Sequence, residues 1–172
     1  MNILSILVSL VVWSTILCTT WADPQDAARF RRLGEEAMLK KNYQESVNLF
    51  TQLIAVSPVS SSYFKRATVY FRQGNYPACV EDLNHALQLT HSTQDGERML
   101  LQRAQARLHL GQCTLAAKDA STIQTTQARE VAQKANECAS ILTKMSRYVR
   151  AHGLSTADAR GDMKKLYALP AP

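Results

Sequence analysis

YFKRATVYFRQGNYPACVEDLNHALQL, residues 63–89, is the stretch that decides the fold, because small residues stand in it where longer side chains would ordinarily fill a helix. These small residues are Ala67, Gly74 and Ala86. Glycine adopts a left-handed backbone at little cost, so Gly74, flanked by Tyr70 and Tyr76, marks a turn rather than a flaw in one helix. The stretch therefore predicts two helices joined as a hairpin.

The same pattern occurs on both sides of this stretch. Residues 30–58 (FRRLGEEAMLKKNYQESVNLFTQLIAVSP) align with residues 63–91 at an offset of 33, and residues 100–124 follow at an offset of 37. A period near 34, with a small residue, a turn, an aromatic, a second small residue and a bulky residue in fixed order, resembles the tetratricopeptide repeat (TPR). Three copies in one register predict an all-α fold, an α-solenoid of three TPR hairpins over residues 27–126.

Each repeat position has a physical role. The first helix of each hairpin carries a small residue where the second helix must approach closely: Gly34, Ala67 and Ala104. The second helix carries a small residue at the matching place: Ser46, Cys79 and Ala116. The third repeat departs from the pattern, with Cys113 in the place of the aromatic and Arg103 and Arg107 at positions that usually pack inward. We expect that repeat to be looser, or its arginine stems to lie along apolar surface with their charges in water.

Residues 127–152 predict a further helix that caps the solenoid. Its apolar residues recur in alternating steps of three and four: Ala128, Val131, Ala135, Cys138, Leu142, Met145 and Val149. Gly153 is the expected C-cap. A coiled-coil seam is the alternative use of this stripe. In the tail, residues 153–172, the pattern leaves open a short helix beginning at Ser155, with Asp158 closing a capping box, or a disordered segment.

The first residues predict a secretory route. Residues 3–18 are almost wholly apolar and uncharged, and Thr20 and Ala22 are the small residues that a signal peptidase reads. We interpret residues 1–22 as a cleaved signal peptide; the alternative is an uncleaved membrane anchor, for which the apolar run is slightly short. The expected location is the lumen of the endoplasmic reticulum (ER), or outside the cell, with no membrane attachment after cleavage.

Composition excludes several classes of function. The net charge of +6 is spread along the chain and lacks the dense basic patch with interleaved aromatics that is typical of nucleic-acid binding. Cys79, Cys113 and Cys138 remain after the signal, and whether Cys113 and Cys138 pair is left open. No catalytic, phosphate-binding or metal-ligand spacing occurs. We expect a protein that is not an enzyme and holds no cofactor or metal.

A stack of helical hairpins offers a concave groove lined by the first helix of each hairpin. The residues expected to face that groove are Arg31, Glu35, Met38, Phe64, Thr68, Phe71, Leu101, Gln105 and Leu108. Five of these nine are Met, Phe or Leu, which predicts binding of an unfolded or extended apolar polypeptide. The alternative TPR site, a clamp for the acidic C-terminus of cytosolic chaperones, is broken because Glu35 and Lys65 stand at two of its positions.

Residues 63–89, together with LLQRAQARLHLGQC (residues 100–113), resemble the N-terminal TPR region of the ER-lumenal TPR/J-domain co-chaperones, the inhibitor-of-PKR-kinase family. The resemblance covers roughly residues 27–124. It implies a lumenal protein that holds unfolded clients and passes them to the lumenal 70-kDa heat-shock chaperone. This chain departs from the family in lacking a His-Pro-Asp tripeptide, and so a J-domain, and in ending in LPAP rather than a KDEL-type signal.

Two classes of function follow from the sequence. The leading hypothesis is a non-enzymatic chaperone or co-chaperone module of the secretory pathway that binds unfolded polypeptide in the apolar groove. The alternative is a structural adaptor that docks one folded partner through the apolar stripe of residues 127–152. A truncated relative of a longer ER co-chaperone is a third reading that the sequence does not separate from these two.

Overall fold

The computed structural model describes residues 24–153. Within this range the chain forms seven α-helices and no strand. They pair as α2 (Pro24–Leu39) with α3 (Tyr43–Val56), α4 (Ser60–Gln73) with α5 (Tyr76–Leu89), and α6 (Thr93–His109) with α7 (Cys113–Ser121), followed by α8 (Thr126–His152). The predicted signal peptide and the predicted helix at Ser155 lie outside the described residues.

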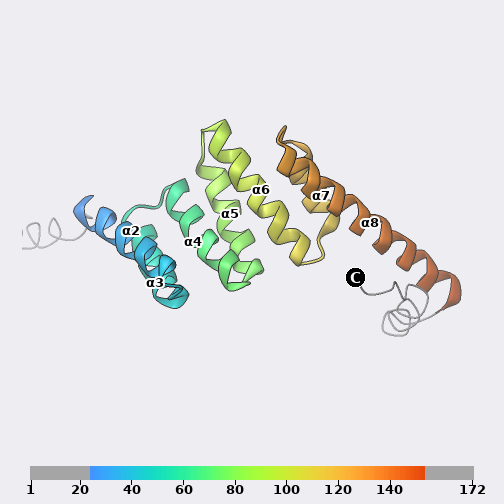
Figure 1. Ribbon diagram of the computed structural model, residues 1–172, viewed down its shortest axis with the longest axis horizontal. Helices are drawn as coiled ribbons and strands as arrows, with labels where there is room; N and C mark the ends of the chain where they lie inside the picture. The colour runs from blue at the N-terminus through green and yellow to red at the C-terminus, as the bar shows by residue number, and fades with distance from the viewer. Residues whose placement is uncertain (1–23, 154–172) are drawn as a thin grey trace, which may run out of the picture.

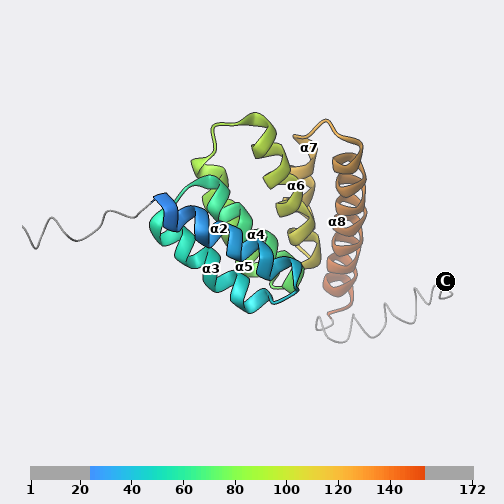
Figure 2. The same ribbon diagram turned by 60° about the vertical axis from the view of Figure 1, so that its left-hand side comes forward.

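The three hairpins stack in chain order. Figure 1 shows them following one another along the long axis of the molecule, and Figure 2 shows α8 lying beside α6 at the far end. Each helix packs against the next one in sequence, and α8 contacts both α7 and α6. The architecture is the expected all-α solenoid of helical hairpins, and it places α2, α4 and α6 as the first helices of the three hairpins.

The small residues of the repeat stand where the helices cross most closely. Ala67 and Ala104 are fully buried, and a Cβ added to Gly34 would lie 2.7 Å from the Phe50 ring. On the second helices, Ser46 is buried and its hydroxyl donates a 2.8 Å hydrogen bond to the Gly34 carbonyl oxygen. The close approach inferred from these positions is confirmed.

The turns inside the hairpins use the left-handed backbone. Gly74 (φ 77°) and Gly111 (φ 71°) take this conformation in the second and third hairpins, as expected of glycine. The first hairpin places Lys41 there, with φ 60°. A lysine is disfavoured at such an angle because its Cβ approaches the backbone. The first turn is therefore the strained member of the three.

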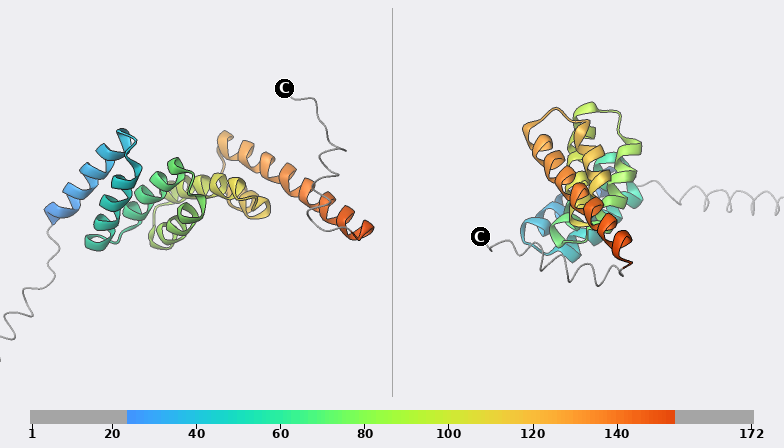
Figure 3. Two further views of the ribbon diagram at one scale, coloured as in Figure 1. Left: turned by 90° about the horizontal axis from the view of Figure 1, so that it is seen from below. Right: turned by 90° about the vertical axis from the view of Figure 1, so that its right-hand side faces the viewer.

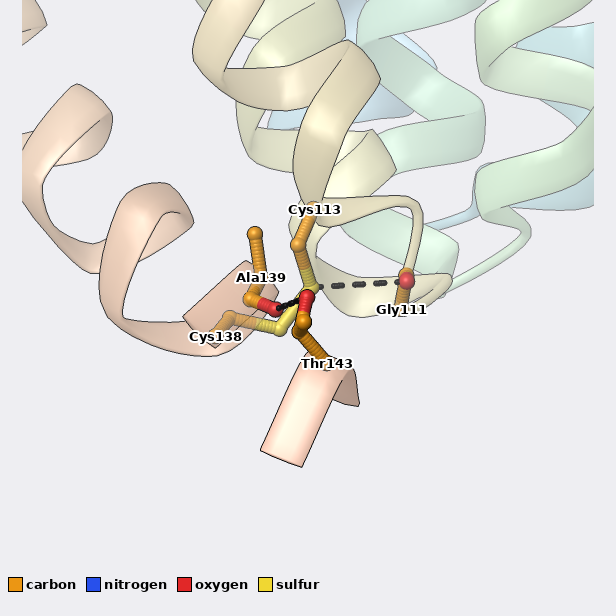
Figure 4. Close-up of a disulfide and its surroundings, with 5 residues drawn as sticks. All are labelled: Gly111, Cys113, Cys138, Ala139 and Thr143. Atoms are coloured by element: carbon orange, nitrogen blue, oxygen red, sulfur yellow. Dashed lines mark hydrogen bonds between the residues drawn. A yellow bond between two sulfur atoms is a disulfide. The ribbon is translucent and has the colours of Figure 1, made fainter. Parts of the chain in front are cut away.

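A disulfide closes the third hairpin against α8. Cys113, at the start of α7, pairs with Cys138 of α8, with their Cα atoms 5.8 Å apart (Figure 4). Cys113 occupies the repeat position of Tyr43 and Tyr76, so a covalent link to the capping helix stands where an aromatic ring covers the other two hairpins. The structure thus answers the question of pairing that the sequence left open, and Cys79 remains a buried free thiol.

The capping helix is packed over only part of its length. Ala128, Val131 and Ala135, in its first half, are buried against the third hairpin. Beyond the disulfide the helix continues to His152, and Gly153 ends it in the left-handed conformation, as predicted. Ile141 and Leu142, in the second half, are exposed. The apolar stripe therefore runs past the surface that the third hairpin offers.

Candidate peptide-binding groove

Four of the nine predicted groove residues meet in one hollow. Phe64 and Thr68 of α4 and Leu101 and Gln105 of α6 line it, and all four are half-buried. Arg98, Gln102 and Gln127 complete the lining of this hollow, whose volume is about 380 Å³. We call it the α4–α6 hollow. Predicted residues of two neighbouring hairpins thus line a common surface in this hollow.

Phe64 and Arg98 join this hollow to a second one. The Arg98 guanidinium carbon lies 5.7 Å from the centroid of the Phe64 ring, a cation–π arrangement. Both residues also line the neighbouring hollow of about 460 Å³, with Lys65, Leu89 and other residues at the α5–α6 connection. The two hollows therefore share Phe64 and Arg98 in their linings.

Amide side chains border the apolar residues in the α4–α6 hollow. Gln102 and Gln105 project from α6, and Gln127 comes from the first turn of α8. The Thr68 hydroxyl donates a 2.9 Å hydrogen bond to the backbone carbonyl oxygen of Phe64 and lies 3.4 Å from the side-chain amide oxygen Oε1 of Gln102. An amide offers both donors and an acceptor, so these side chains can pair with the backbone of an extended chain whatever its sequence.

The three predicted groove residues near the C-terminal ends of α2, α4 and α6 pack against other side chains. Met38 packs against the cluster that contains Phe50 and Leu53, and Leu108 packs against the cluster of Ala104, Ala120 and Val131. Phe71 contacts Tyr76 and His109 edge to face, with ring centroids 5.5 and 6.0 Å apart. These three residues are half-buried, but they do not line the α4–α6 hollow.

The polar residues predicted on α2 lie apart from the hollow. Glu35 forms an ion pair with Lys65 of α4, and Arg31 is exposed. Glu35 and Lys65 stand at two of the positions that a carboxylate clamp would use, so each already neutralises the other. Arg98, at a third such position, lies over Phe64 and 3.7 Å from a carboxylate oxygen of Asp95. This geometry leaves no set of converging free cations at the clamp positions.

Behind the groove, two hairpins carry a matching buried ion pair that the sequence reasoning missed. Arg66 donates through Nε and Nη2 to the two carboxylate oxygens of Asp82, at 2.8 and 2.7 Å. Arg103 does the same to Asp119, at 2.8 Å for both bonds. The remaining guanidinium nitrogen reaches the preceding hairpin: Thr51 accepts from Arg66 at 3.0 Å, and Asn84 accepts from Arg103 at 2.7 Å.

These pairs correct the second of the two expectations for the third repeat, that its arginine charges lie in water. Asp82 is 3% and Asp119 is 5% exposed, and Arg107 adds a further 2.6 Å hydrogen bond to Asp119. The hydrogen bonds to Asp82 hold the pKa of Arg66 above its ordinary value, against the opposite effect of burial. The arginines therefore pack inward as ion pairs, because a carboxylate from the second helix meets each of them.

No helix within residues 24–153 is long and apolar enough to cross a bilayer. No group of three His, Cys, Asp or Glu side chains in the same range is placed to bind a metal ion.

Comparison with solved structures defines the class of fold. No protein-family model matches the chain. The first TPR domain of Spaghetti (RPAP3), bound to the HSP90 peptide SRMEEVD, is 21% identical and has a TM-score of 0.62, covering 69% of this chain and 96% of that one. The TPR2B domain of yeast Sti1, in complex with an Hsp70 peptide, is 20% identical, with a TM-score of 0.58 and coverage of 67% and 98%.

Yeast Tom70 is similar over a smaller part of its own length. It is 19% identical, with a TM-score of 0.62, and the match covers 73% of this chain and 26% of Tom70. At this level of identity the likeness shows the fold alone, and that fold is the TPR solenoid. The prediction of an all-α solenoid built from TPR hairpins is thus confirmed.

Proposed function

We propose that this protein binds unfolded or extended polypeptide along α4 and α6 and acts as a chaperone or co-chaperone module of the secretory pathway. The observation that carries the proposal is the α4–α6 hollow, where the half-buried Phe64 and Leu101 lie among three glutamine amides. Apolar side chains of a client would contact the ring and the leucine, while its backbone pairs with the amides. Such contacts tolerate many sequences, as a client-holding protein requires.

The solved TPR domains support an extended ligand in general. The matched domains of Spaghetti and Sti1 hold peptides of HSP90 and Hsp70. In this chain the ion pair between Glu35 and Lys65 argues against the same acidic ligand. We therefore assign the groove to apolar segments rather than to a chaperone C-terminus. A heat-shock chaperone of the ER is proposed as the partner that receives the client, on the family resemblance alone.

The secretory location rests on the sequence of residues 1–22 and gains support from the disulfide. Disulfides persist in oxidising compartments and are rare in the cytosol. The Cys113–Cys138 bridge links α8 to α7, a helix of only nine residues. The proposal places the protein in the ER lumen or outside the cell. Protease protection of a tagged copy in microsomes tests this part, and a cytosolic copy would overturn it while leaving the groove intact.

Suppression of client aggregation tests the groove. The protein, purified from the secretory pathway of a eukaryotic host, should slow the aggregation of a thermally unfolded client, and Phe64→Ser with Leu101→Ser should remove this activity. If a client covers about 50 Å² of each side chain, the loss is about 2.5 kcal/mol, or about 70-fold in affinity. Leu115→Ser, a matched change at an exposed leucine on α7, is the control. Unchanged activity in the double variant would refute the proposed site.

A further inference from the structure

Few apolar side chains hold α8 to the rest of the molecule. Among its 27 residues only Ala128, Val131 and Ala135 are buried. Two of these three are alanines, so the apolar area that they remove from water is small. None of residues 139–152 is buried, and the left view of Figure 3 shows the end of α8 running past the stacked hairpins. Apolar packing alone therefore holds α8 weakly.

Polar side chains do not add to this attachment within residues 24–153. The side-chain hydrogen bonds of α8 in that range stay inside the helix or its N-cap. The second and third hairpins differ, because the Arg66–Asp82 and Arg103–Asp119 ion pairs each join their two helices. No ion pair of this kind joins α8 to another helix in the described range.

The Cys113–Cys138 disulfide stands at the end of the packed half of α8. Cys138 follows Ala135, the last buried residue of the helix, by three positions. At the opposite end of this half, residues 122–125 connect α8 to α7, and Ile123 anchors the connection because it is buried. α8 is thus attached at two points, the chain connection and the bridge. Opening the bridge leaves a weakly packed helix that can pivot about the connection.

α8 lies beside apolar side chains of α6 that belong to the predicted groove (Figure 2). Leu101 and Leu108 pack against the cluster that contains Val131 of α8. Gln127, in the first turn of α8, lines the α4–α6 hollow together with Leu101. α8 therefore borders the groove at its third hairpin. Leu108 does not line the hollow, and movement of α8 would expose it beside Leu101.

A reductant can reach the bridge. Cys113 is 1% exposed, but Cys138 is only half-buried. A hollow of about 420 Å³ lies beside the bridge, with Cys113, Ala139 and Thr143 in its lining (Figure 4). Cys113 is also the first residue of α7, and a helix N-terminus stabilises a thiolate. Attack on Cys138, with Cys113 as the leaving group, is therefore the favoured direction of thiol–disulfide exchange.

We propose that the Cys113–Cys138 disulfide is a redox latch whose reduction releases α8 from α6 and enlarges the apolar groove. The reductant is a dithiol, such as that of a C-x-x-C oxidoreductase. One of its sulfurs attacks Cys138 as a thiolate, and the electron pair of the disulfide bond leaves on Cys113. Its second sulfur then attacks the mixed disulfide and expels Cys138. The reductant ends as a disulfide, and its two protons end on the two cysteines.

Hydrogen exchange of the full-length protein, with and without dithiothreitol at a temperature well below Tm, tests the latch. On reduction, the amides of residues 126–138 should exchange at least tenfold faster, whereas those of residues 60–89 should change less than twofold. Cys113→Ala with Cys138→Ala should exchange fast in this segment without reductant and should not respond to it. Cys79→Ala, at the buried cysteine outside the bridge, should respond as the unsubstituted protein does.

The link from the latch to client binding rests on the proposed function, and fluorescence anisotropy tests it. The probe is a fluorescein-labelled 12-residue peptide in which leucine alternates with glycine and serine. If the peptide covers about 40 Å² more apolar surface once α8 has moved, the reduced protein should bind it about fivefold more tightly. Leu108→Ser should remove this gain, whereas Leu115→Ser, at an exposed leucine of α7, should retain it.

Two outcomes would overturn the latch. Unchanged exchange in residues 126–138, with Cys113 and Cys138 shown by alkylation to be reduced, would mean that other contacts hold α8. An equal rise throughout residues 24–153 would mean that reduction unfolds the solenoid instead of freeing one helix. Faster exchange of α8 without tighter peptide binding would refute the enlarged groove. Failure of the peptide to bind in either redox state would refute the proposed function, whereas faster exchange of α8 would still support the latch.

Discussion

Removing one partner of the Arg66–Asp82 ion pair should lower the free energy of unfolding substantially, whereas replacing both partners by apolar residues should change it little. Asp82→Asn leaves the guanidinium of Arg66 without the carboxylate that accepts two of its hydrogen bonds. The Arg66 side chain is 18% exposed. Breaking a buried pair costs about 3–5 kcal/mol, because the remaining charge stays out of water. The partial exposure of Arg66 places the expected loss near the lower end, about 3 kcal/mol.

The first hairpin supplies the design of the compensating variant. At the offset of 33 residues, Leu33 and Leu49 stand where the second hairpin has Arg66 and Asp82, and both leucines are half-buried. The solenoid therefore already contains one hairpin with two leucines in place of the ion pair. Arg66→Leu with Asp82→Leu copies that arrangement into the second hairpin, removing both charges at once. We expect the double variant to lose about 1 kcal/mol or less, since replacing a buried pair by apolar groups is often nearly neutral.

Asp119 gives an internal comparison of magnitude. Its carboxylate accepts hydrogen bonds from both Arg103 and Arg107, whereas Asp82 serves one arginine. Asp119→Asn should therefore cost more than Asp82→Asn, about 4–5 kcal/mol. At about 3 °C per kcal/mol for a chain of this size, Tm should fall by about 12 °C.

Thermal and urea unfolding, followed by far-UV circular dichroism, measure these differences. A double-mutant cycle of Arg66→Leu and Asp82→Leu should give a coupling energy of about 2 kcal/mol or more, because each single change leaves one charge without its partner. Additive losses in the cycle would refute the view that the cost arises from an orphaned charge. A loss below about 1 kcal/mol for Asp119→Asn would refute the view that Asp119 is the carboxylate partner that two buried arginines require.

Three further predictions concern the turns and the cysteines. Lys41→Gly should raise the free energy of unfolding by about 1 kcal/mol, because glycine removes the strain of φ 60°, and chemical denaturation measures it; a loss would contradict the assigned strain. Reducing the Cys113–Cys138 bridge, which spans 25 residues, should lower the free energy of unfolding by about 3.5 kcal/mol. The loss is measured as a lower Tm in dithiothreitol, and an unchanged Tm would contradict the prediction. Burial raises the pKa of Cys79 to about 12. Its alkylation by iodoacetamide at pH 8 should therefore be about 1000-fold slower than that of the unfolded chain, and the rate should rise with pH. Equal alkylation rates for the folded and unfolded chains would contradict the raised pKa.

The fold could be predicted because two helices can cross closely only where their side chains are small, and these small residues recur in the sequence. Gly34, Ala67 and Ala104 recur at the two repeat offsets, and each is buried where two helices cross. The arginine–aspartate pairs carry a sequence signal of the same kind, which the repeat comparison left unused. Arg103 and Asp119 each lie 37 residues after their counterparts in the second hairpin, the same offset as the small residues. Comparing charged positions in the alignment would have found them.

The groove could be predicted only in part, because a repeat position fixes the direction of a side chain but not its neighbours. Phe64 and Leu101 share a repeat position, and both line the α4–α6 hollow. Phe71, two turns further along α4, also points from a first helix, yet it meets Tyr76 and the next hairpin's His109. Gln127 was missed because it belongs to the capping helix, outside the three repeats from which the groove was inferred.

The two exposed apolar surfaces of this protein differ in their chemistry. In the α4–α6 hollow, apolar side chains stand beside neutral amides and Arg98, which lies 3.7 Å from a carboxylate oxygen of Asp95. Glu35 already pairs with the nearby Lys65. In the second half of α8, Ile141 and Leu142 are exposed on one side of the helix, whereas Arg147 and Arg150 project from the other side. Hydrogen-bonding groups therefore stand beside apolar side chains only in the α4–α6 hollow, which is the arrangement that favours weak binding to many sequences.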